Sequence, residues 1–428
     1  MSIKVLVVGS GGRESAIAWK ISQSDSLAAL YCLPGNPGTS TFASNIAAGA
    51  LDFEAIAAAV EKYGIELVVV GPEAPLVEGL TDFLKSRFPS LMVVGPGKVG
   101  AMLEGSKEFA KDFMRRHSIP TAAYRSFTKE TMAEAFAFME TLKPPYVLKA
   151  DGLAAGKGVV ILDDIAAARQ ELEQMFSGKF GAASSKVVIE QFLSGIEVSV
   201  FVLTDGRDYM VLPEAKDYKR IGEGDTGLNT GGMGAVSPVP FADKAFMSKV
   251  EERIIKPTIA GLQADGIDYK GFIFIGLMNC GGAPYVIEYN VRMGDPETES
   301  VMTRIDSDFL HHLAAAASGT LAGESIKISP QAAVTVVMVS GGYPEHYKSL
   351  YPIHGLEQAG GRNVNVFHMG TKDSSEGVVS AGGRVLAVTA NAPDIQRAAQ
   401  KAYKAVAGID FKDCYYRGDI TKDLEKYL

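Results

Sequence analysis

The chain has 428 residues, of which 47% are hydrophobic and 21% are charged, and its formal net charge is −8. This composition is typical of a globular protein with roughly two to four domains, and the acidic balance argues against nucleic-acid binding. Three widely spaced cysteines, no leader-like N-terminus and no apolar run of ~18 residues predict a cytoplasmic protein without a membrane span.

The first hundred residues alternate between apolar strands and helices. Strands are predicted at 3–8, 28–33, 66–71 and 91–95, and helices at 14–22 and 53–64. Continuous Val/Ile/Leu strands separated by helices indicate a parallel, doubly wound sheet. We therefore expect ligands at the carboxyl ends of these strands, where the sequence reads GSGGRES, PGNPGT and GPEAPL.

The glycine-rich turn after the first strand is an incomplete dinucleotide-binding motif. Gly9 and Gly11 fit GxGxxG, but Glu14 stands at the third glycine position, and the second strand ends without the expected acid. This disfavours NAD and an oxidoreductase. A tight turn and an anion-binding helix N-terminus are both open, and Arg13 favours a phosphate because its guanidinium suits phosphate oxygens.

From about residue 102 the chain becomes richer in strands. A helix is predicted at 106–117, a Gly/Pro loop at 226–240, a helix around 250–262, and strands at 272–278 and 285–290. The last hundred residues, with strands at 332–340 and 383–390 and a terminal helix, predict a small α/β domain.

The stretch VLKADGLAAGKGVVI predicts a phosphate-binding hairpin rather than a Walker loop. Three residues, not four, separate Gly152 from Gly156, and Gly158 follows Lys157 where a hydroxyl is required. The β-branched run that follows indicates a strand, and a glycine-rich hairpin can bring backbone amides close to phosphates. A flexible surface hairpin is the alternative, but Lys149 at the end of an apolar strand favours an anionic partner.

Two later strand ends carry polar groups. Residues 190–193 and Glu197 could offer adenine-binding backbone groups and a ribose-binding carboxylate, although any strand end could look similar. Glu288 and Asn290 share one strand face with Arg292 following, an arrangement that suits Mg²⁺ held between protein oxygens and phosphates. A polar edge strand would explain the first two residues but not the acids of the RMGDPE turn.

Together these motifs resemble the ATP-grasp superfamily and, within it, the glycinamide ribonucleotide synthetase (phosphoribosylamine–glycine ligase) family. The family's order is followed by GGRE, GPEAPLV, LEGSK, KADGLAAGKGV, DTGLNTGGMGA, IEYNVRMGDPET and GGRVLAVTA. The resemblance implies an α/β and α+β fold. Its parts would be a doubly wound N-terminal domain (1–102), a two-subdomain ATP-grasp core (103–325, lid about 123–193) and a small α/β C-terminal domain (326–428).

The resemblance implies a ligation of glycine to 5-phosphoribosylamine that converts ATP to ADP and phosphate, in de novo purine synthesis. Glycine would first form glycyl phosphate, and the amine would then displace the phosphate. The expected partners are small molecules, with no nucleic acid and no membrane, and the expected state is a monomer or weak homo-oligomer. Another ATP-grasp carboxylate–amine ligase and a non-catalytic nucleotide-binding module are the alternatives, and TGLNTGGMGA and RMGDPET favour the glycine ligase.

The resemblance also implies the site residues. The expected catalytic residues are Arg292 and Lys149. ATP contacts are expected from Lys107, Lys149, Gly152, Gly156, Lys157, Gly158, Glu190, Gln191, Phe192, Leu193 and Glu197. Substrate contacts are expected from Gly11, Gly12, Arg13, Asp217, Lys219 and Asp295. Mg²⁺ or Mn²⁺ would be held by Glu288 and Asn290.

Overall fold

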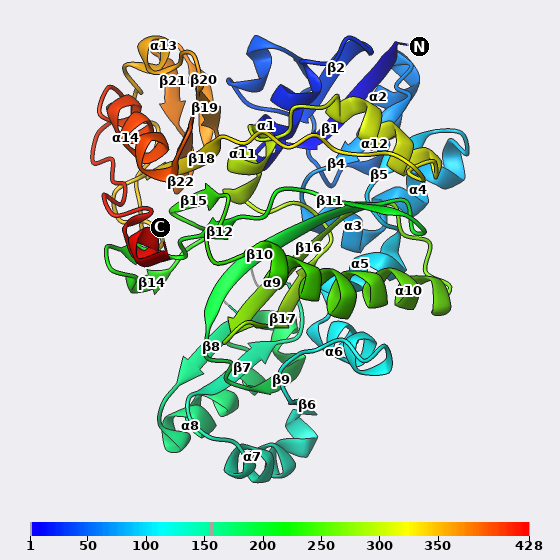
Figure 1. Cartoon of the computed structure of the whole chain (residues 1–428), viewed down its shortest axis with the longest axis vertical. Helices are drawn as coiled ribbons and strands as arrows, with labels where there is room; N and C mark the ends of the chain where they lie inside the picture. Colours follow the sequence, from blue (N-terminus) through cyan, green and yellow to red (C-terminus); the bar gives the residue numbers. More distant parts are fainter. Residues whose placement is uncertain (1, 154–157, 428) are drawn as a thin grey trace.

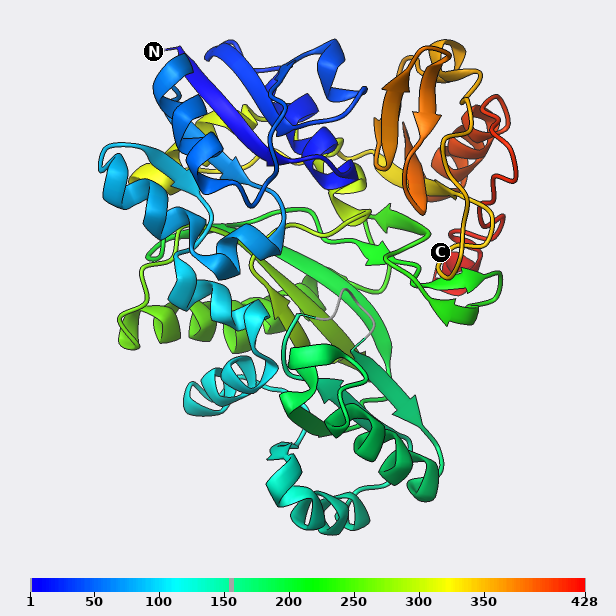
Figure 2. The same cartoon turned by 180° about the vertical axis from the view of Figure 1, so that it is seen from behind.

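The computed structural model describes residues 2–153 and 158–427. The N-terminal domain (blue) and the C-terminal domain (orange to red) lie side by side at one end of the molecule (Figures 1 and 2). A small subdomain with α7 (Met132–Thr141) and α8 (Ile165–Phe176) lies at the opposite end. None of the helices in the described ranges is long and apolar enough to cross a membrane.

The N-terminal sheet is parallel throughout, with the strand order β3-β2-β1-β4-β5. Its strands are β1 (Ile3–Gly9), β2 (Leu27–Pro34), β3 (Ser44–Asn45), β4 (Leu67–Val70) and β5 (Met92–Val94). The accompanying helices are α1 (Gly12–Ile21), α2 (Phe53–Tyr63), α3 (Glu73–Glu78), α4 (Leu80–Arg87) and α5 (Lys98–Gly105). Residues 5–9 of β1 and all of β4 are buried, as continuous apolar runs require, so the predicted doubly wound sheet is confirmed.

The small subdomain contains an antiparallel sheet with the order β6-β9-β7-β8. Its strands are β6 (Tyr124–Thr128), β7 (Tyr146–Ala150), β8 (Val159–Leu162) and β9 (Lys186–Gln191). Lys149 pairs with Val159 across the β7–β8 hairpin, which confirms the predicted strand on each side of the glycine-rich stretch. Leu148 and Leu172 belong to a separate hydrophobic core beneath α7 and α8, so this subdomain has its own packing unit.

A second antiparallel sheet forms the centre of the molecule, with the order β11-β10-β16-β17. Its strands are β10 (Ile196–Thr204), β11 (Tyr209–Val211), β16 (Gly271–Cys280) and β17 (Ala283–Asn290). The nearby helices are α6 (Lys107–Arg116), α9 (Lys244–Val250) and α10 (Lys256–Ala264). The register of β16 and β17 shifts near their middle and places Gly276 opposite Glu288, so no side chain stands across from that carboxylate.

The C-terminal sheet draws strands from two distant parts of the chain. Its order is β12-β15-β18-β22-β19. These strands are β12 (Lys216–Asp217), β15 (Gly234–Ser237), β18 (Ala332–Val339), β19 (Val364–His368) and β22 (Arg384–Ala392). Other elements nearby are the β13–β14 hairpin (Arg220–Gly222, Thr226–Asn229), α11 (Glu297–Met302) and α14 (Ile395–Val406). In contrast, α12 (Phe309–Ser318) packs against β5 and α1 of the N-terminal domain. A sheet shared in this way ties the central segment 216–237 to the C-terminal domain.

Residues 415–423, here called the C-terminal strap, lie against the segment that begins at β12. The buried Arg417 pairs with Asp419 at 2.7 Å and donates to the Arg220 carbonyl at 3.1 Å. The Tyr218 hydroxyl donates to Asp423 at 2.6 Å. The strap therefore contacts this segment at the Tyr218 side chain and at the Arg220 backbone, within and directly after residues 217–219.

Candidate functional site

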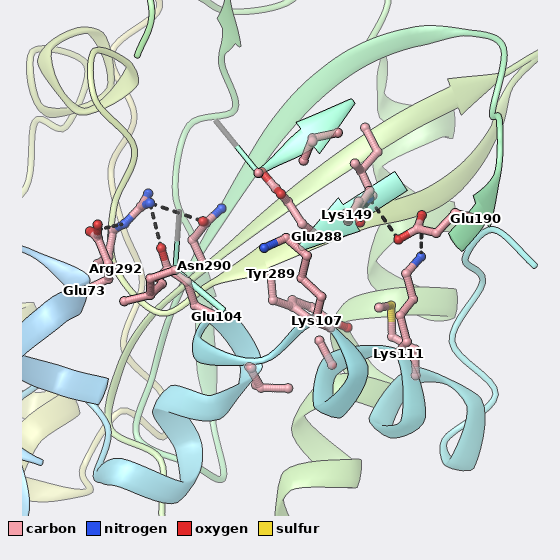
Figure 3. A pocket seen from close by; sticks show the side chains of 17 residues that line it. Glu73, Glu104, Lys107, Lys111, Lys149, Glu190, Glu288, Tyr289, Asn290 and Arg292 are labelled. Carbon is pink, nitrogen blue, oxygen red and sulfur yellow. Dashed lines mark hydrogen bonds and ion pairs between the residues drawn. The ribbon is translucent and has the colours of Figure 1, made fainter. Parts of the chain in front are cut away.

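A cavity of about 170 Å³ lies between α6, the β7–β8 hairpin and the end of β17 (Figure 3). Leu153 and Gly158 also line it. The predicted ATP contacts Gly156 and Lys157 belong to residues 154–157, which lie outside the described ranges. The charged and amide side chains in its wall are Glu73, Glu104, Lys107, Lys111, Lys149, Glu190, Glu288, Asn290 and Arg292. The cavity thus brings together ionisable groups from the N-terminal domain, α6, the sheet of the small subdomain and the central sheet.

One wall of the cavity holds a carboxylate between two lysines. Lys149 Nζ lies 3.0 Å from Glu190 Oε1, and Lys111 Nζ lies 2.9 Å from Glu190 Oε2. Burial opposes ionisation of Glu190, but the two ammonium groups together hold its pKa below the usual value. Burial also lowers the pKa of Lys111 to about 8, against the opposing effect of Glu190. The wall therefore carries one net positive charge when all three groups are ionised.

Lys107 is the first residue of α6, and its surroundings tie that helix to the β7–β8 hairpin. The Asp151 carboxylate accepts the Glu108 backbone N–H at 2.8 Å, so this helix N-terminus already has an anionic partner. Lys107 Nζ donates to the Gly152 carbonyl at 3.3 Å. Burial lowers the pKa of Lys107, while Glu288 opposes the shift and the neighbouring Lys149 adds to it. Lys107 and Lys149 thus lie on the same side of the cavity.

Arg292 joins the end of β17 to the N-terminal domain. It contacts Glu104 at 2.7 Å, Glu73 at 3.3 Å and the Asn290 side-chain oxygen at 3.2 Å (Figure 3). Burial raises the pKa of Glu104, and Arg292 opposes that shift. The structure therefore brings the predicted Glu288, Asn290 and Arg292 into one cavity, with two acids that hold the guanidinium in place.

Sequence reasoning missed three of these groups. Lys111 lies one helical turn after Lys107, so the i, i+4 spacing on a predicted helix could have placed both on one face. Glu104 and Glu73 belong to the motifs LEGSK and GPEAPLV, which carried the resemblance without a role for either acid. Their function as partners of Arg292 depends on contacts across 188 and 219 residues, which no local pattern shows.

The segment predicted to bind adenine connects β9 to β10. The Gln191 side chain is exposed, and Phe192 and Leu193 are half-buried. Among the described residues, the backbone groups of Phe192 and Leu193 form no backbone hydrogen bond, so they are available to a ligand. The Glu190 side chain, in contrast, faces the two lysines.

The predicted ribose contact, Glu197, forms an ion pair with Lys219, which the sequence assigns to the other substrate. Lys219 lowers the pKa of Glu197 and also lies 3.8 Å from Asp217. Burial raises the pKa of Asp217. These three side chains form one cluster, and the Glu288 carboxylate lies close enough to favour the charged form of Lys219.

The N-terminal turn at residues 11–13, predicted to contact substrate, lies against Asp295. The backbone N–H of Arg13 donates to Asp295 at 3.2 Å, and the Arg13 side chain donates to the Gly71 carbonyl at 2.8 Å. Arg384 of the C-terminal domain lies 2.9 Å from the other Asp295 oxygen. The Arg13 guanidinium is also 3.8 Å from Glu73, which contacts Arg292. The turn at 11–13 is therefore connected to the cavity through shared acids.

Glu297 makes the stability of the ligand-free protein depend on pH in a predictable way. It accepts a hydrogen bond from Ser199, and burial, with a further contribution from Asp217, raises the pKa of Glu297 to about 7. Because the folded protein holds this proton more tightly than the unfolded chain, Glu297 costs stability as pH rises from about 5 to 7. We expect Glu297→Gln to gain stability relative to the unsubstituted protein as pH rises from about 5 to 8, measured by thermal unfolding.

The exposed Glu61→Gln is the matched control and should show the same offset from the unsubstituted protein at every pH. A constant offset for Glu297→Gln as well would contradict the buried, protonated state of Glu297.

Three family models match the chain in succession. The phosphoribosylglycinamide synthetase N domain matches residues 3–104, its ATP-grasp (A) domain matches 105–298, and its C domain matches 333–423. The phosphoribosylamine–glycine ligase of Rhizobium meliloti is 46% identical over 418 residues, which cover 98% of each chain. That of Chlorobaculum tepidum is 45% identical over 429 residues, covering 98% of this chain and 99% of the relative.

Solved structures give a similar result. The phosphoribosylamine–glycine ligase of Thermotoga maritima superposes with a TM-score of 0.85 at 34% identity, covering 97% of this chain and all of that one. The biotin carboxylase domain of the Hydrogenobacter thermophilus 2-oxoglutarate carboxylase, bound to MgADP, has a TM-score of 0.72 at 18% identity. It covers 96% of this chain and 91% of that chain. The second likeness concerns the fold alone.

Proposed function

The chain belongs to the phosphoribosylglycinamide synthetase family, and from its membership and its site we propose how it ligates glycine to 5-phosphoribosylamine. The reaction consumes ATP and yields glycinamide ribonucleotide, ADP and phosphate, a step of purine biosynthesis. The observation that carries the assignment is the match of all three domains to one family, together with 46% identity over 98% of the chain. The cavity supplies the residues for the chemistry.

In the first step, a glycine carboxylate oxygen attacks the γ-phosphorus of ATP, and ADP leaves. Glycyl phosphate results, because the new P–O bond replaces the one to the β-phosphate. Such phosphoryl transfer needs mainly positioning and charge neutralisation. We assign Lys107 and Lys149 to the phosphates, since both ammonium groups enter the cavity beside Glu288. Arg292, already oriented by Glu73 and Glu104, would stabilise the transferring phosphoryl group.

In the second step, the amine of 5-phosphoribosylamine attacks the acyl carbon of glycyl phosphate. The C–O bond to phosphate breaks, an amide bond forms, and the amine nitrogen releases one proton. We assign the turn at 11–13 with Asp295 and the cluster around Asp217 and Lys219 to this substrate. What supports this assignment is their position on two sides of the cavity, where they connect to Glu73 and Glu288.

The nucleoside end of ATP is assigned to the β9–β10 connection. Within the described parts of the chain, the backbone groups of Phe192 and Leu193 have no backbone partner and suit an adenine edge. The exposed Gln191, with Gly152 and Gly158 of the glycine-rich hairpin, would border the nucleotide. The Glu197 carboxylate would accept hydrogen bonds from the ribose while it remains paired with Lys219.

ATP-grasp enzymes use ATP with Mg²⁺, and the donors in the cavity fit that ion. Glu288 and Asn290 offer a carboxylate and an amide oxygen, the ligand types that Mg²⁺ prefers. Within residues 2–153 and 158–427, no group of three or more His, Cys, Asp or Glu side chains could hold a metal by itself. Phosphate oxygens and water would therefore complete the coordination. When bound, the ion would neutralise charge on the transferring phosphoryl group.

Finer points extend this proposal. Mn²⁺ is proposed as an alternative to Mg²⁺, because the same oxygen donors suit both ions. We further propose a cytoplasmic location, a monomer or weak homo-oligomer in solution, and units with boundaries near residues 102 and 325. What supports the location is the absence of metal-like or paired spacing among Cys32, Cys280 and Cys414, which are all free thiols.

The assignment has a direct test. The protein is incubated with ATP, Mg²⁺ and glycine, with and without freshly generated 5-phosphoribosylamine, and phosphate release and product mass are measured. We expect ADP and glycinamide ribonucleotide to appear together only when all substrates are present. ADP formation without the ribonucleotide, in a preparation that binds ATP, would overturn the assignment.

A further inference from the structure

The wall of the cavity contains one lysine that the proposed reaction does not use. We propose that Lys111 is a positioning residue: it neutralises Glu190, so that Lys149 can leave this carboxylate and contact a nucleotide phosphate. The inference rests on the proposed function, which assigns Lys149 to ATP. Lys111 itself would not touch the substrates.

Glu190 needs a permanent counter-ion because its side chain is only 4% exposed. Lys149, on the neighbouring strand β7, and Lys111, on α6, reach different oxygens of the same carboxylate (Figure 3). A buried carboxylate left with no partner is strongly unfavourable, because its lost hydration is not compensated. Two lysines therefore compensate the charge of Glu190, although one would be sufficient.

Lys111 is the more firmly held of the two lysines. Its side chain is 2% exposed, and Nζ donates to the Thr121 hydroxyl at 2.7 Å. That hydroxyl in turn donates to the Val286 carbonyl at 2.7 Å, so the ammonium is anchored to the strand beside the cavity. Beyond its ion pair with Glu190, Lys149 Nζ in the described parts of the chain donates one long hydrogen bond, 3.3 Å to the Ile287 carbonyl.

The geometry therefore makes Lys149 the group that can be released. When Lys149 moves toward a phosphate, Lys111 stays 2.9 Å from Glu190 and keeps the carboxylate compensated. Without Lys111, Lys149 would be the sole counter-ion, and every contact it made with a phosphate would weaken its contact with Glu190. The affinity for ATP would therefore fall, whereas the affinities for glycine and 5-phosphoribosylamine would not.

The first test is Lys111→Met, which keeps the length and apolar stem of the side chain but removes the charge. We expect the dissociation constant for ATP, measured by titration calorimetry without turnover, to rise about tenfold or more. The KM values for glycine and 5-phosphoribosylamine should stay within about twofold. Lys111→Arg, which keeps the charge, should bind ATP nearly normally, and Lys98→Met, on an exposed site of α5, is the matched control.

The decisive variant combines Lys111→Met with Glu190→Gln. A neutral amide needs no counter-ion, so Lys149 is free again, and we expect ATP affinity to recover to within about threefold of that of Glu190→Gln alone. A merely structural role for Lys111 predicts the opposite, because the double variant would lose two buried groups and bind ATP no better. Unchanged ATP affinity in Lys111→Met, or no recovery in the double variant, overturns the proposal.

These readouts separate the inference from the proposed function. ATP affinity is measured without product formation, so it reports on Lys111 even if the ligated product is not glycinamide ribonucleotide. If the single variant fails to fold, the comparison of the double variant with Glu190→Gln still decides. The proposal requires these two to bind ATP equally well, and a tenfold loss between them contradicts it.

Discussion

Glu288→Gln is expected to lower kcat at least about a thousandfold while leaving the fold intact, because several kcal/mol of charge stabilisation would depend on the ion that Glu288 is proposed to bind. The substitution keeps the size of the side chain and removes one negative charge. Glu288 is only partly buried and pairs with Gly276 through the backbone of β17, which the substitution does not alter. The measurement is steady-state turnover at saturating substrates, with circular dichroism to follow the fold.

The control for this substitution is Glu173→Gln on the exposed face of α8, which should retain full activity. Raising the Mg²⁺ concentration should restore part of the lost rate if the amide still binds the ion weakly. Turnover of Glu288→Gln near that of the unsubstituted protein would remove the metal-ligand assignment.

Arg292→Lys should lower kcat by about 10²- to 10³-fold, although the charge is kept. One guanidinium contacts Glu73, Glu104 and Asn290 at the same time, and a single ammonium on a shorter reach cannot replace that fork. We also expect the free energy of unfolding to fall by about 1–3 kcal/mol, because the buried Glu104 loses its close partner. Turnover and thermal unfolding measure the two effects separately.

The exposed Arg397→Lys on α14 is the control for the change of side chain and should alter neither quantity. A variant that loses stability but keeps its rate would assign Arg292 to the domain contact alone. Rescue of turnover by added guanidinium ion would support the catalytic role.

Local patterns predicted most of the N-terminal domain and both sides of the glycine-rich hairpin. A short apolar run such as residues 5–8, ended by Gly9, is typical of a buried strand because it is too short for a helix, so its type and burial follow from the sequence. The sheet to which Asp217 belongs could not be predicted from local patterns. Asp217 lies on β12, which pairs with β15 and so extends a sheet formed mainly by residues beyond 331. Such pairing depends on the tertiary fold and leaves no local periodicity.

The candidate site shows the same division. Glu288 and Asn290 could be placed on one face because strand geometry alternates strictly, and Lys149 was conspicuous as a lysine in an apolar strand. The ion pairs that tune them were not visible, since Lys111 and Glu190 are 79 residues apart in the chain and meet only after folding. The sequence therefore indicates the candidate ligand-binding groups better than the side chains that hold them in place.

The C-terminal strap has a consequence for the order in which the protein becomes active during synthesis. Arg417 reaches a carbonyl that lies 197 residues earlier, and Asp423 accepts a hydrogen bond from Tyr218, 205 residues earlier. A growing chain can complete the N-terminal sheet early, since domains fold as units while translation proceeds. Residues 217–219 reach their final position only once the strap has left the ribosome. The cluster of Asp217 and Lys219, which we propose contacts 5-phosphoribosylamine, would therefore acquire these contacts late in synthesis.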